Sequence, residues 1–415
     1  MTKPPLRVFE TQNFKAIRAS GKIKFDWLTC FIGNNGVGKS SLIEALETFR
    51  DVVGKDLDKA MRRWRGFEHV WNRCPDRTVI SAYAKKPSES LSREEYSQEK
   101  KKYLEALTEP ERFSDPMRFM MDWTWNSHSY KVLQSISQGP GGNSVFITEE
   151  SYVHKSKSGT ERMSRDSNGK ANYDSDGPKD NEGFKDFVVK QKLGPGVSLL
   201  ALDDMDDWQF LRLNPEVLGQ PRTQTLATNR VRLSTDGSNI AEYLNEIRKS
   251  DPNAFEGILQ SLSYVLPYAR DLQPVMTSEL ERTFYLNLSE GQFKVPGWLL
   301  SSGTLRIVAI LACLRHPNPP PLLVIEEIEN GLDPRSLKLV VEEMRAAIGA
   351  QKTQIIITTH SPFLLDLLDL SHLIVVDRVN GEPKFTRPDE KELATWSKSF
   401  TPGRLYTMGR LTKET

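Results

Sequence analysis

The sequence predicts an α/β protein with a mixed sheet, an N-terminal antiparallel β layer and an inserted lobe of helices and strands. Residues 303–379 alternate short apolar runs with helical ones, which is typical of a parallel sheet covered on both faces. Residues 6–32 carry β-branched and aromatic runs and lead into a glycine-rich loop followed by a helix. Both ends of the chain therefore contribute to one sheet, and the insertion lies between them.

The composition limits the classes of protein to consider. The chain has 415 residues, 38% of them hydrophobic and 27% charged, as in globular proteins. Its net charge is +1, so any nucleic-acid or membrane surface must be local. The three cysteines, Cys30, Cys74 and Cys313, are far apart, which favours reduced thiols. No apolar run is long enough to span a bilayer, so we expect a cytoplasmic protein without membrane contact.

The N-terminal elements follow from local patterns. "LRVFETQNF" and "KIKFDWLTCFI" predict strands, and "RASGK" predicts the turn between them. "SSLIEALETFRDVV" has apolar residues at helical spacing, with Gly54 as its stop. "RTVISAYAKK" predicts a further strand.

The middle of the chain differs in character. Residues 87–112 are charged and helix-prone, whereas residues 118–155 alternate in a way that indicates antiparallel strands. Residues 155–184 are poor in apolar side chains, and we expect a mobile hairpin tip or linker there. Residues 237–265 predict helices, with Ser238 or Asn239 as an N-cap.

These patterns divide the chain into four parts. The expected parts are the glycine-loop half of the sheet (1–85), an insertion with a flexible stretch at 155–184 (86–225), a helical lobe (226–295) and the second half of the sheet (296–415).

The stretch "GNNGVGKSS" matches the phosphate-binding pattern G-x-x-x-x-G-K-[ST], between a strand and a helix as that pattern requires. Backbone N–H groups of such a loop surround phosphate oxygens, and the helix N-terminus favours negative charge. Lys39 would neutralise the β and γ phosphates, and Ser40 would bind Mg²⁺. A chance loop is the alternative. The residues expected to hold ATP are Asn34, Asn35, Gly36, Val37, Gly38, Lys39, Ser40 and Ser41.

Three candidate catalytic groups follow two apolar strands. Glu326 and Glu327 end "LLVIEE", and His360 ends "IIITTH". The carboxyl ends of parallel strands are where open α/β sheets bind ligands. We expect Glu326 to join Ser40 in holding Mg²⁺, Glu327 to orient the attacking water, and His360 to touch the γ phosphate. The alternative is a solvated strand end with His360 as a helix cap.

"LLSSGTLRIVAILACL" resembles the signature of ABC and SMC-type ATPases through Leu300, Ser301, Ser302, Gly303 and Thr304. In that family the signature of one subunit closes over the nucleotide of another. The resemblance therefore implies an ABC/SMC-like P-loop ATPase head, and a homodimer or higher oligomer with ATP sandwiched between subunits. It also implies a D-loop in "ENGLDPRS", with Asp333 facing the partner, and a switch histidine at His360.

Five stretches together narrow the resemblance to the RecF/OLD-like ABC ATPases of bacterial antiphage systems, a type that includes the Septu ATPase PtuA and the PARIS ATPase AriA. They are the segment from Phe14 to Phe49, "LSTDGSNIAEYLNEI", "SSGTLRIVAILACL", "VIEEIENGLDP" and "IIITTHSPFLLDLL". They leave about residues 85–225 unmatched. The family often has Asp where this chain has Glu326, and no Q-loop glutamine stands out.

The resemblance implies an ATPase that senses a phage component and controls a separately encoded effector, such as a nuclease. No nuclease domain is expected in this chain, because only a short segment follows "HLIVVDRV". The run Asp203, Asp204, Asp206 and Asp207 is read as a solvated turn in preference to a metal site.

Other functions remain open. Basic residues interleave with Trp64 and Trp71, a mixture that suits nucleic-acid contact or, equally, a solvated face or protein-docking surface. A RecF-like DNA repair ATPase is thus the main alternative. A transporter subunit and an ATP-gated scaffold with little turnover are weaker ones. The basic residues in question are Lys59, Arg62, Arg63 and Arg65.

Overall fold

A computed structural model describes most of the chain. The described residues are 4–54, 56–72, 115–125, 128–138, 145–157, 159–165, 171–176, 205, 207–224, 231–278 and 280–411. The strand expected in "RTVISAYAKK", the helix-prone run 87–112 and Cys74 lie outside them.

The central sheet joins both ends of the chain, as the sequence predicts. Its strand order is β10–β15–β16–β4–β17–β18, and every pair is parallel except β17 with β18. Every residue of β4, β15 and β16 is buried, which explains their continuous apolar sequences. The strands are β10 (Gln209–Leu211), β15 (Leu322–Ile325), β16 (Gln354–Thr359), β4 (Leu28–Ile32), β17 (Leu373–Val379) and β18 (Glu382–Thr386).

An antiparallel sheet forms the second layer. Its order is β2–β1–β5–β6–β7–β8–β9, with β3 also paired to β1. Because β5 pairs directly with β1, the strands predicted at 118–155 extend the N-terminal layer across the expected boundary at residue 85. The strands are β1 (Leu6–Phe14), β2 (Ile17–Ala19), β3 (Ile23–Lys24), β5 (Met117–Trp125), β6 (His128–Gln138), β7 (Val145–Lys155), β8 (Thr160–Arg165) and β9 (Ala171–Ser175).

Part of the stretch 155–184 lies in the antiparallel sheet. It contributes β8 and β9, which form the outer edge of the antiparallel sheet. These strands carry few apolar residues. Strand β8 nevertheless buries Met163, and its Arg165 pairs with the fully buried Glu150.

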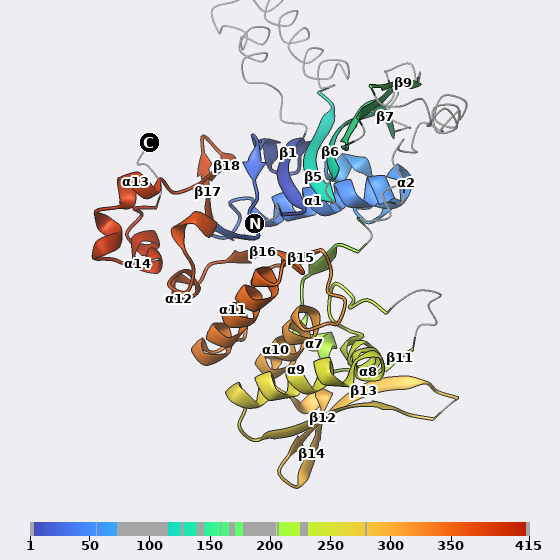
Figure 1. The fold of residues 1–415 in the computed structure, drawn as a ribbon, viewed down its shortest axis with the longest axis vertical. Helices are drawn as coiled ribbons and strands as arrows, with labels where there is room; N and C mark the ends of the chain where they lie inside the picture. Colours follow the sequence, from blue (N-terminus) through green and yellow to red (C-terminus); the bar gives the residue numbers. More distant parts are fainter. Residues whose placement is uncertain are drawn as a thin grey trace, which may run out of the picture.

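Helix α1 (Lys39–Gly54) lies between the two sheets, and the remaining large helices cover the opposite face of the central sheet (Figure 1). The first core contains apolar residues of α1, β1, β5 and one face of the central strands. The second contains the other face with α8 (Ile240–Ser250), α9 (Pro252–Val265), α10 (Ser302–Leu314) and α11 (Pro334–Gly349). The central sheet is thus buried on both faces.

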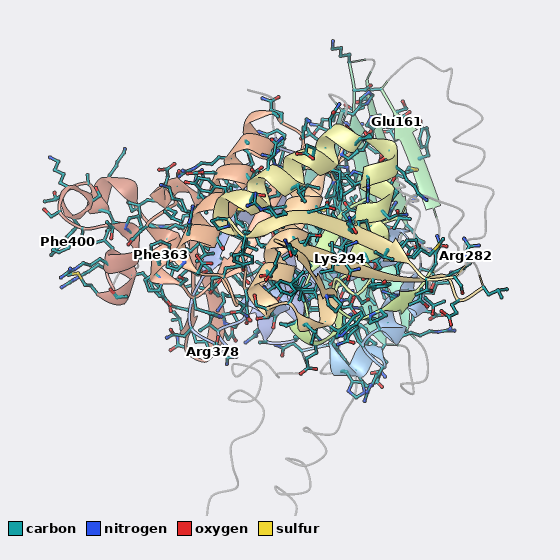
Figure 2. All side chains as sticks on the ribbon, turned by 90° about the horizontal axis from the view of Figure 1, so that it is seen from below. Glu161, Arg282, Lys294, Phe363, Arg378 and Phe400 are labelled. Carbon is teal, nitrogen blue, oxygen red and sulfur yellow. The ribbon has the colours of Figure 1, made fainter. Side chains whose placement is uncertain are left out.

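The helical lobe also carries a small antiparallel sheet of four strands. Strand β13 (Thr283–Glu290) is its centre: β12 (Ala269–Met276) pairs with one edge of β13, and β11 (Arg222–Thr223) and β14 (Phe293–Pro296) both pair with the other edge. Figure 2 shows this sheet from below, with Lys294 on its surface. The helices α8 and α9 bear out the prediction for 237–265, and Asn239 is the N-cap of α8.

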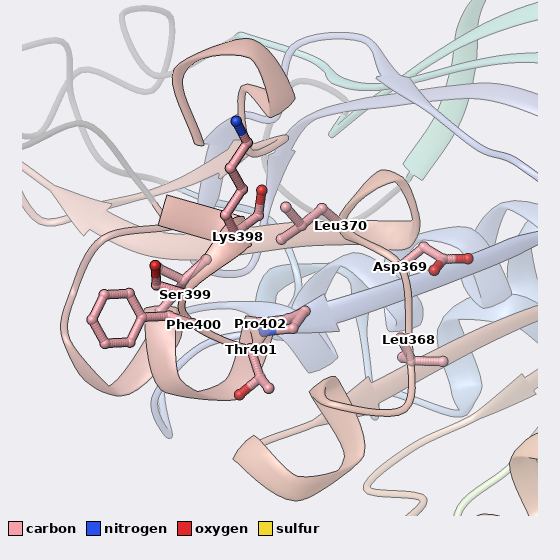
Figure 3. Close-up of a pocket in the computed structure, with 10 residues that line it drawn as sticks. Leu368, Asp369, Leu370, Lys398, Ser399, Phe400, Thr401 and Pro402 are labelled. Atoms are coloured by element: carbon pink, nitrogen blue, oxygen red, sulfur yellow. The ribbon is translucent and has the colours of Figure 1, made fainter. Parts of the chain in front are cut away.

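Shorter helices connect these parts. They are α2 (Leu57–Arg62), η1 (Phe67–His69), α7 (Pro215–Leu218), η4 (Gly297–Leu299), α12 (Pro362–Leu365), η5 (Leu370–His372), α13 (Glu390–Leu393), η6 (Trp396–Lys398) and α14 (Pro402–Thr407). The last five form a C-terminal segment with a pocket of about 460 Å³ between η5 and the residues that lead into α14 (Figure 3).

Gln354 joins the two sheets at the start of β16. Its side-chain carbonyl accepts from Leu6 N at 2.7 Å, and its amide donates to Leu6 O at 2.8 Å and Asp26 O at 2.9 Å. The side chain is fully buried. It therefore satisfies backbone groups of the N-terminal layer that no strand pairing reaches.

We predict that Gln354→Leu destabilises the protein, because it leaves those backbone groups without partners at a cost of about 2–4 kcal/mol. Chemical denaturation followed by circular dichroism measures the change. Gln260→Leu, at an exposed position of α9, is the matched control and should change stability by less than about 0.5 kcal/mol. Equal midpoints for the two variants would contradict the role given to Gln354.

Candidate functional site

The glycine loop connects β4 to α1 at the carboxyl edge of the central sheet. A Cβ on Gly33 would lie 2.2 Å from Val376 O, and one on Gly38 would lie 2.7 Å from the Pro383 ring. Only glycine fits at either position, so the loop is held tightly against β17 and β18. Asn34, Asn35 and Gly36 are exposed, as are Ser40 and, in part, Ser41, whereas Val37 is buried.

Lys39 is buried at the start of α1, with 6% of its surface exposed. Its ammonium donates to Gly33 O at 2.5 Å and to Asn34 O at 2.9 Å. Burial lowers the pKa of Lys39, and three nearby glutamates oppose that shift. Two carbonyl oxygens of the loop thus bind the Lys39 ammonium. Phosphate oxygens of a ligand could replace them as its hydrogen-bond partners.

Glu326 follows β15 and lies against Ser40. It is 9% exposed. Burial raises its pKa, while the Arg212 guanidinium and a hydrogen bond with the Ser40 side chain oppose the rise. The Nε atom of Arg212 lies 2.5 Å from a carboxylate oxygen of Glu326. A serine hydroxyl beside a carboxylate is a ligand set that Mg²⁺ prefers, so these two residues fit that ion.

Glu327 has an unusual backbone conformation. Its φ of 48° is in the left-handed region, which is unfavourable for a residue with a Cβ. Hydrogen bonds with three other residues hold it there. Its N–H donates to Thr358 Oγ1 at 2.9 Å, its carbonyl accepts from Arg306 Nη2 at 2.8 Å, and its carboxylate accepts from the Asn330 amide. The side chain is 47% exposed, so water can reach it.

His360 links Lys39 to Glu327. Its Nδ1 lies 3.3 Å from Lys39 Nζ, and its Nε2 lies 3.5 Å from a carboxylate oxygen of Glu327. Nδ1 also lies 3.4 Å from Gly33 O, the same carbonyl oxygen that the Lys39 ammonium contacts. The structure therefore brings together the three residues expected to carry catalysis.

Sequence reasoning missed three charged residues of this site. Glu329 accepts from His360 N at 2.6 Å. Arg306, in the signature helix, donates to Glu327 O and, at 2.8 Å, to Leu213 O. Arg212 pairs with Glu326 from the position after β10. A lone arginine inside an apolar run, as in "FLRLN" and "TLRIVAI", is a usable signal, because a buried cation requires a partner. For Glu329 the sequence offers no comparable signal.

The signature residues lie at the start of α10. Ser301 caps this helix by accepting from Thr304 N at 3.1 Å, and both Ser301 and Ser302 are exposed. Gly303 packs on the turn before α11, where an added Cβ would meet Gly331 O at 2.2 Å. The signature and the turn that ends at Asp333 thus form one continuous surface.

Asp333 has an intramolecular role. It is the N-cap of α11 and accepts from Arg335 N at 2.8 Å and Ser336 N at 3.1 Å. Its second oxygen accepts from Ser336 Oγ at 2.6 Å, and this bond is the main cause of the lowered pKa of Asp333. Both oxygens are therefore engaged in the cap, although the residue is exposed.

The expected nucleic-acid residues are all exposed, but the tryptophans among them are engaged. Lys59, Arg62, Arg63 and Arg65 lie on α2 and the following turn. The Trp64 ring donates to Thr48 Oγ1 at 2.9 Å and has the Lys15 ammonium 3.8 Å above it. Trp71 donates to Asp115 O at 3.0 Å. The ring N–H groups of both indoles are therefore already paired within the chain.

The remaining expectations concern a metal site at the aspartate run and a membrane-spanning helix. Within the described parts of the chain, no three His, Cys, Asp or Glu side chains gather as metal ligands would. Asp203, Asp204 and Asp206 fall outside those parts, and Asp207 pairs with Arg232 at 2.6 Å. A search of the described helices gives none with the length and apolarity needed to cross a membrane.

Comparison with known families supports a nucleotide-dependent enzyme. Residues 6–113 match a family model described as "AAA ATPase domain", and residues 170–366 match one described as "AAA domain, putative AbiEii toxin, Type IV TA system". Together the two matches include the glycine loop, both glutamates after β15 and His360. With this site on the central sheet, the two matches support an ATPase with a phosphate-binding loop.

Particular relatives are distant. No curated protein matches the chain. Among solved structures, an Smc head bound to the C-winged helix domain of ScpA is 13% identical, with a TM-score of 0.45, over 94% of this chain and 99% of that one. The SMC head domain from Thermotoga maritima is 16% identical, with a TM-score of 0.38, over 93% and 99% of the two chains.

We predict that Arg306→Met lowers ATP turnover about 10- to 100-fold while ATP affinity stays close to that of the parent. The variant frees the carbonyl of Glu327, and a small displacement of a catalytic group is enough for such a loss. Steady-state hydrolysis and fluorescent-nucleotide titration separate the two quantities.

Arg315→Met is the matched control, because Arg315 lies just past the end of α10 and pairs with Glu343 at 2.7 Å. If both variants lose turnover equally, Arg306 contributes only to stability.

Proposed function

We propose that this ATPase is a nucleotide-driven sensor and regulator in an antiphage defence system, where it controls a separately encoded effector such as a nuclease. The observation that carries the ATPase part is the chain of contacts from Lys39 through His360 to Glu327 at the edge of the sheet. The family match over 170–366, whose description names a toxin of a type IV TA system, supports a role in a multi-gene conflict system.

Each residue of the site has a separate role in the proposed hydrolysis. Asn34 to Ser41 surround the phosphates, and Lys39 neutralises the β and γ groups. Ser40 and Glu326 would hold Mg²⁺, which supplies charge neutralisation when bound. Glu327 accepts the proton of the attacking water, and His360 positions the γ phosphate between Lys39 and Glu327.

A homodimer, or a higher oligomer built from it, fits the exposed surface around the signature. Trp298 and Leu299 immediately precede it and are 43% and 69% exposed. Apolar side chains beside an exposed helix N-terminus form a surface that association would cover. In this dimer Ser301, Ser302 and Gly303 of one subunit contact the ATP of the other, and Asp333 lies at the interface.

A RecF-like repair ATPase that binds DNA is the second candidate. The exposed basic side chains of α2 and the following turn favour it. The two functions differ in their partners. Copurification of the adjacent gene's product favours defence, whereas ATP-dependent duplex affinity of the isolated protein favours repair.

We predict that Glu327→Gln binds ATP with Mg²⁺ but hydrolyses it about 100- to 10,000-fold more slowly, since general-base catalysis contributes that much. Light scattering should then show a stable dimer in ATP. Lys39→Ala should bind no nucleotide and stay monomeric under the same conditions.

Hydrolysis by Glu327→Gln at the parental rate would show that another group is the base. A monomer at every ATP concentration would contradict the shared site.

A further inference from the structure

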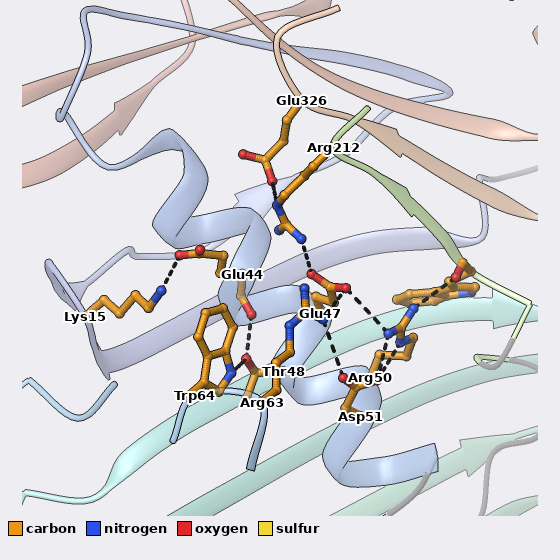
Figure 4. A network of polar contacts seen from close by, with 11 residues as sticks. Lys15, Glu44, Glu47, Thr48, Arg50, Asp51, Arg63, Trp64, Arg212 and Glu326 are labelled. Atoms are coloured by element: carbon orange, nitrogen blue, oxygen red, sulfur yellow. Dashed lines mark hydrogen bonds and ion pairs between the residues drawn. The ribbon is translucent and has the colours of Figure 1, made fainter. Parts of the chain in front are cut away.

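Two polar clusters in the described part of the chain lie apart from the catalytic residues. In the first, Arg63 and Arg212 pair with Glu47 of α1 (Figure 4). Its positive and negative side chains balance one another, so it is complete without a ligand. The second cluster is on the antiparallel sheet and contains two histidines, His128 of β6 and His154 of β7. Imidazole nitrogens, unlike those of arginine, are metal ligands.

The strand register brings the two imidazole rings together. His154 is opposite Tyr130 on β6 and opposite Glu161 on β8. His128 precedes Tyr130 by two residues, so both point to the same face of the sheet. The rings of His128 and His154 are stacked, with centroids 4.9 Å apart and 14° between their planes. The ring of Tyr130 stacks on that of His154 at 4.8 Å. Packing therefore fixes the position of both histidines.

One nitrogen of each ring faces the other ring. Nδ1 of His128 lies 2.7 Å from Nε2 of His154. On the opposite side of the His154 ring, Nδ1 lies 2.9 Å from a carboxylate oxygen of Glu161. Because an ionised carboxylate only accepts hydrogen bonds, Nδ1 of His154 carries a proton. The lone pair of the neutral ring is then on Nε2, and it is directed at His128.

Glu161 is itself held in place. Tyr173 of β9 donates to its second carboxylate oxygen at 3.2 Å. Histidines that bind metal ions commonly donate from their other nitrogen to a carboxylate, which fixes the tautomer and makes the ring a stronger electron donor. The side chains of His154 and Glu161 are 17% and 20% exposed, so an ion in solution can reach them. His154 thus has the partner that a metal-binding histidine requires.

The distance between the two facing nitrogens selects the type of ion. With metal–nitrogen bonds of about 2.0 Å, two ligands at a right angle are about 2.8 Å apart, whereas two ligands of a tetrahedral ion are about 3.3 Å apart. The observed 2.7 Å matches the right-angle arrangement. Cu²⁺ and Ni²⁺ favour square-planar or octahedral sites with such angles, and Zn²⁺ in proteins is mainly tetrahedral. One ring must tilt slightly so that both lone pairs converge on the ion.

We propose that Nδ1 of His128 and Nε2 of His154 bind a divalent transition-metal ion of the Cu²⁺ or Ni²⁺ type, with water in its remaining coordination positions. The ion replaces the proton between the two nitrogens, and that proton moves through solvent to Nε2 of His128, so both rings stay neutral. With two protein ligands instead of three or four, the site exchanges its ion. The bound ion joins β6 to β7 and stabilises the folded chain. This inference does not depend on the proposed function.

Isothermal titration calorimetry with Cu²⁺, Ni²⁺ and Zn²⁺ chlorides tests the site in the full-length chain without nucleotide. We expect Ni²⁺ to bind at least as tightly as Zn²⁺. His128→Gln removes one ligand and should weaken Ni²⁺ binding by more than about 10-fold, whereas Glu161→Gln keeps both ligands and should weaken it about 10-fold. His69→Gln, at an exposed histidine of η1, is the matched control and should leave the affinity unchanged.

Electron paramagnetic resonance of the Cu²⁺-loaded chain gives a second readout, because splitting by imidazole nitrogens identifies the ligands directly. The parent should show two such nitrogens. The pattern should be reduced or absent in His128→Gln, and circular dichroism checks that this variant is folded.

Three results would overturn the proposal. The first is equal Ni²⁺ affinity of the parent, His128→Gln and His69→Gln. The second is a Cu²⁺ spectrum without nitrogen splitting, since oxygen ligands elsewhere would then hold the ion. The third is tighter binding of Zn²⁺ than of Ni²⁺, which contradicts the right-angle geometry. If His128→Gln does not fold, Glu161→Gln decides, and an unchanged Ni²⁺ affinity in that variant counts against the site.

Discussion

Three glutamates within four residues would repel one another at the edge of a sheet unless cations held them. Glu326, Glu327 and Glu329 are balanced by Lys39, Arg212 and Arg306, which come from α1, the residue after β10, and α10. The glutamates are local in sequence, whereas their counter-ions are not. Charge balance at this point therefore requires the glycine loop, the edge strand and the signature helix to be assembled together.

Burying these charged groups costs free energy, even though their charges balance. Burial lowers the pKa of Lys39 and of Arg306 and raises that of Glu326, because it disfavours the charged form of each group. Removing one member leaves an uncompensated buried charge, which is worse than removing a pair. The left-handed backbone of Glu327 adds strain at the same place. A bound anion or cation would therefore change the balance of charge at this site.

The sequence was informative where structure is local. The glycine loop, the apolar strands before Glu326 and His360, and the helices α8 to α11 follow from periodicity and motif, and the structure has them. Contacts between distant parts of the chain could not be predicted from the sequence. Nothing in the sequence of β5 indicates that it pairs with β1, and nothing in "FLRLN" indicates that Arg212 pairs with Glu326. Asp333 was expected to face a partner through family resemblance, yet its local sequence, with Pro and Ser after it, also predicts the helix cap that is observed.

The two arginines also connect the helical lobe to the candidate site. The chain leaves the central sheet after β10 at Arg212 and returns through α10, where Arg306 binds both Leu213 O and Glu327 O. Any rotation of the lobe that moves α10 must either break these bonds or move the carbonyl of Glu327. Any ligand that alters the pairing of Arg212 acts on the other end of the same connection. The backbone positions of Leu213 and Glu327 are therefore linked to each other through Arg306.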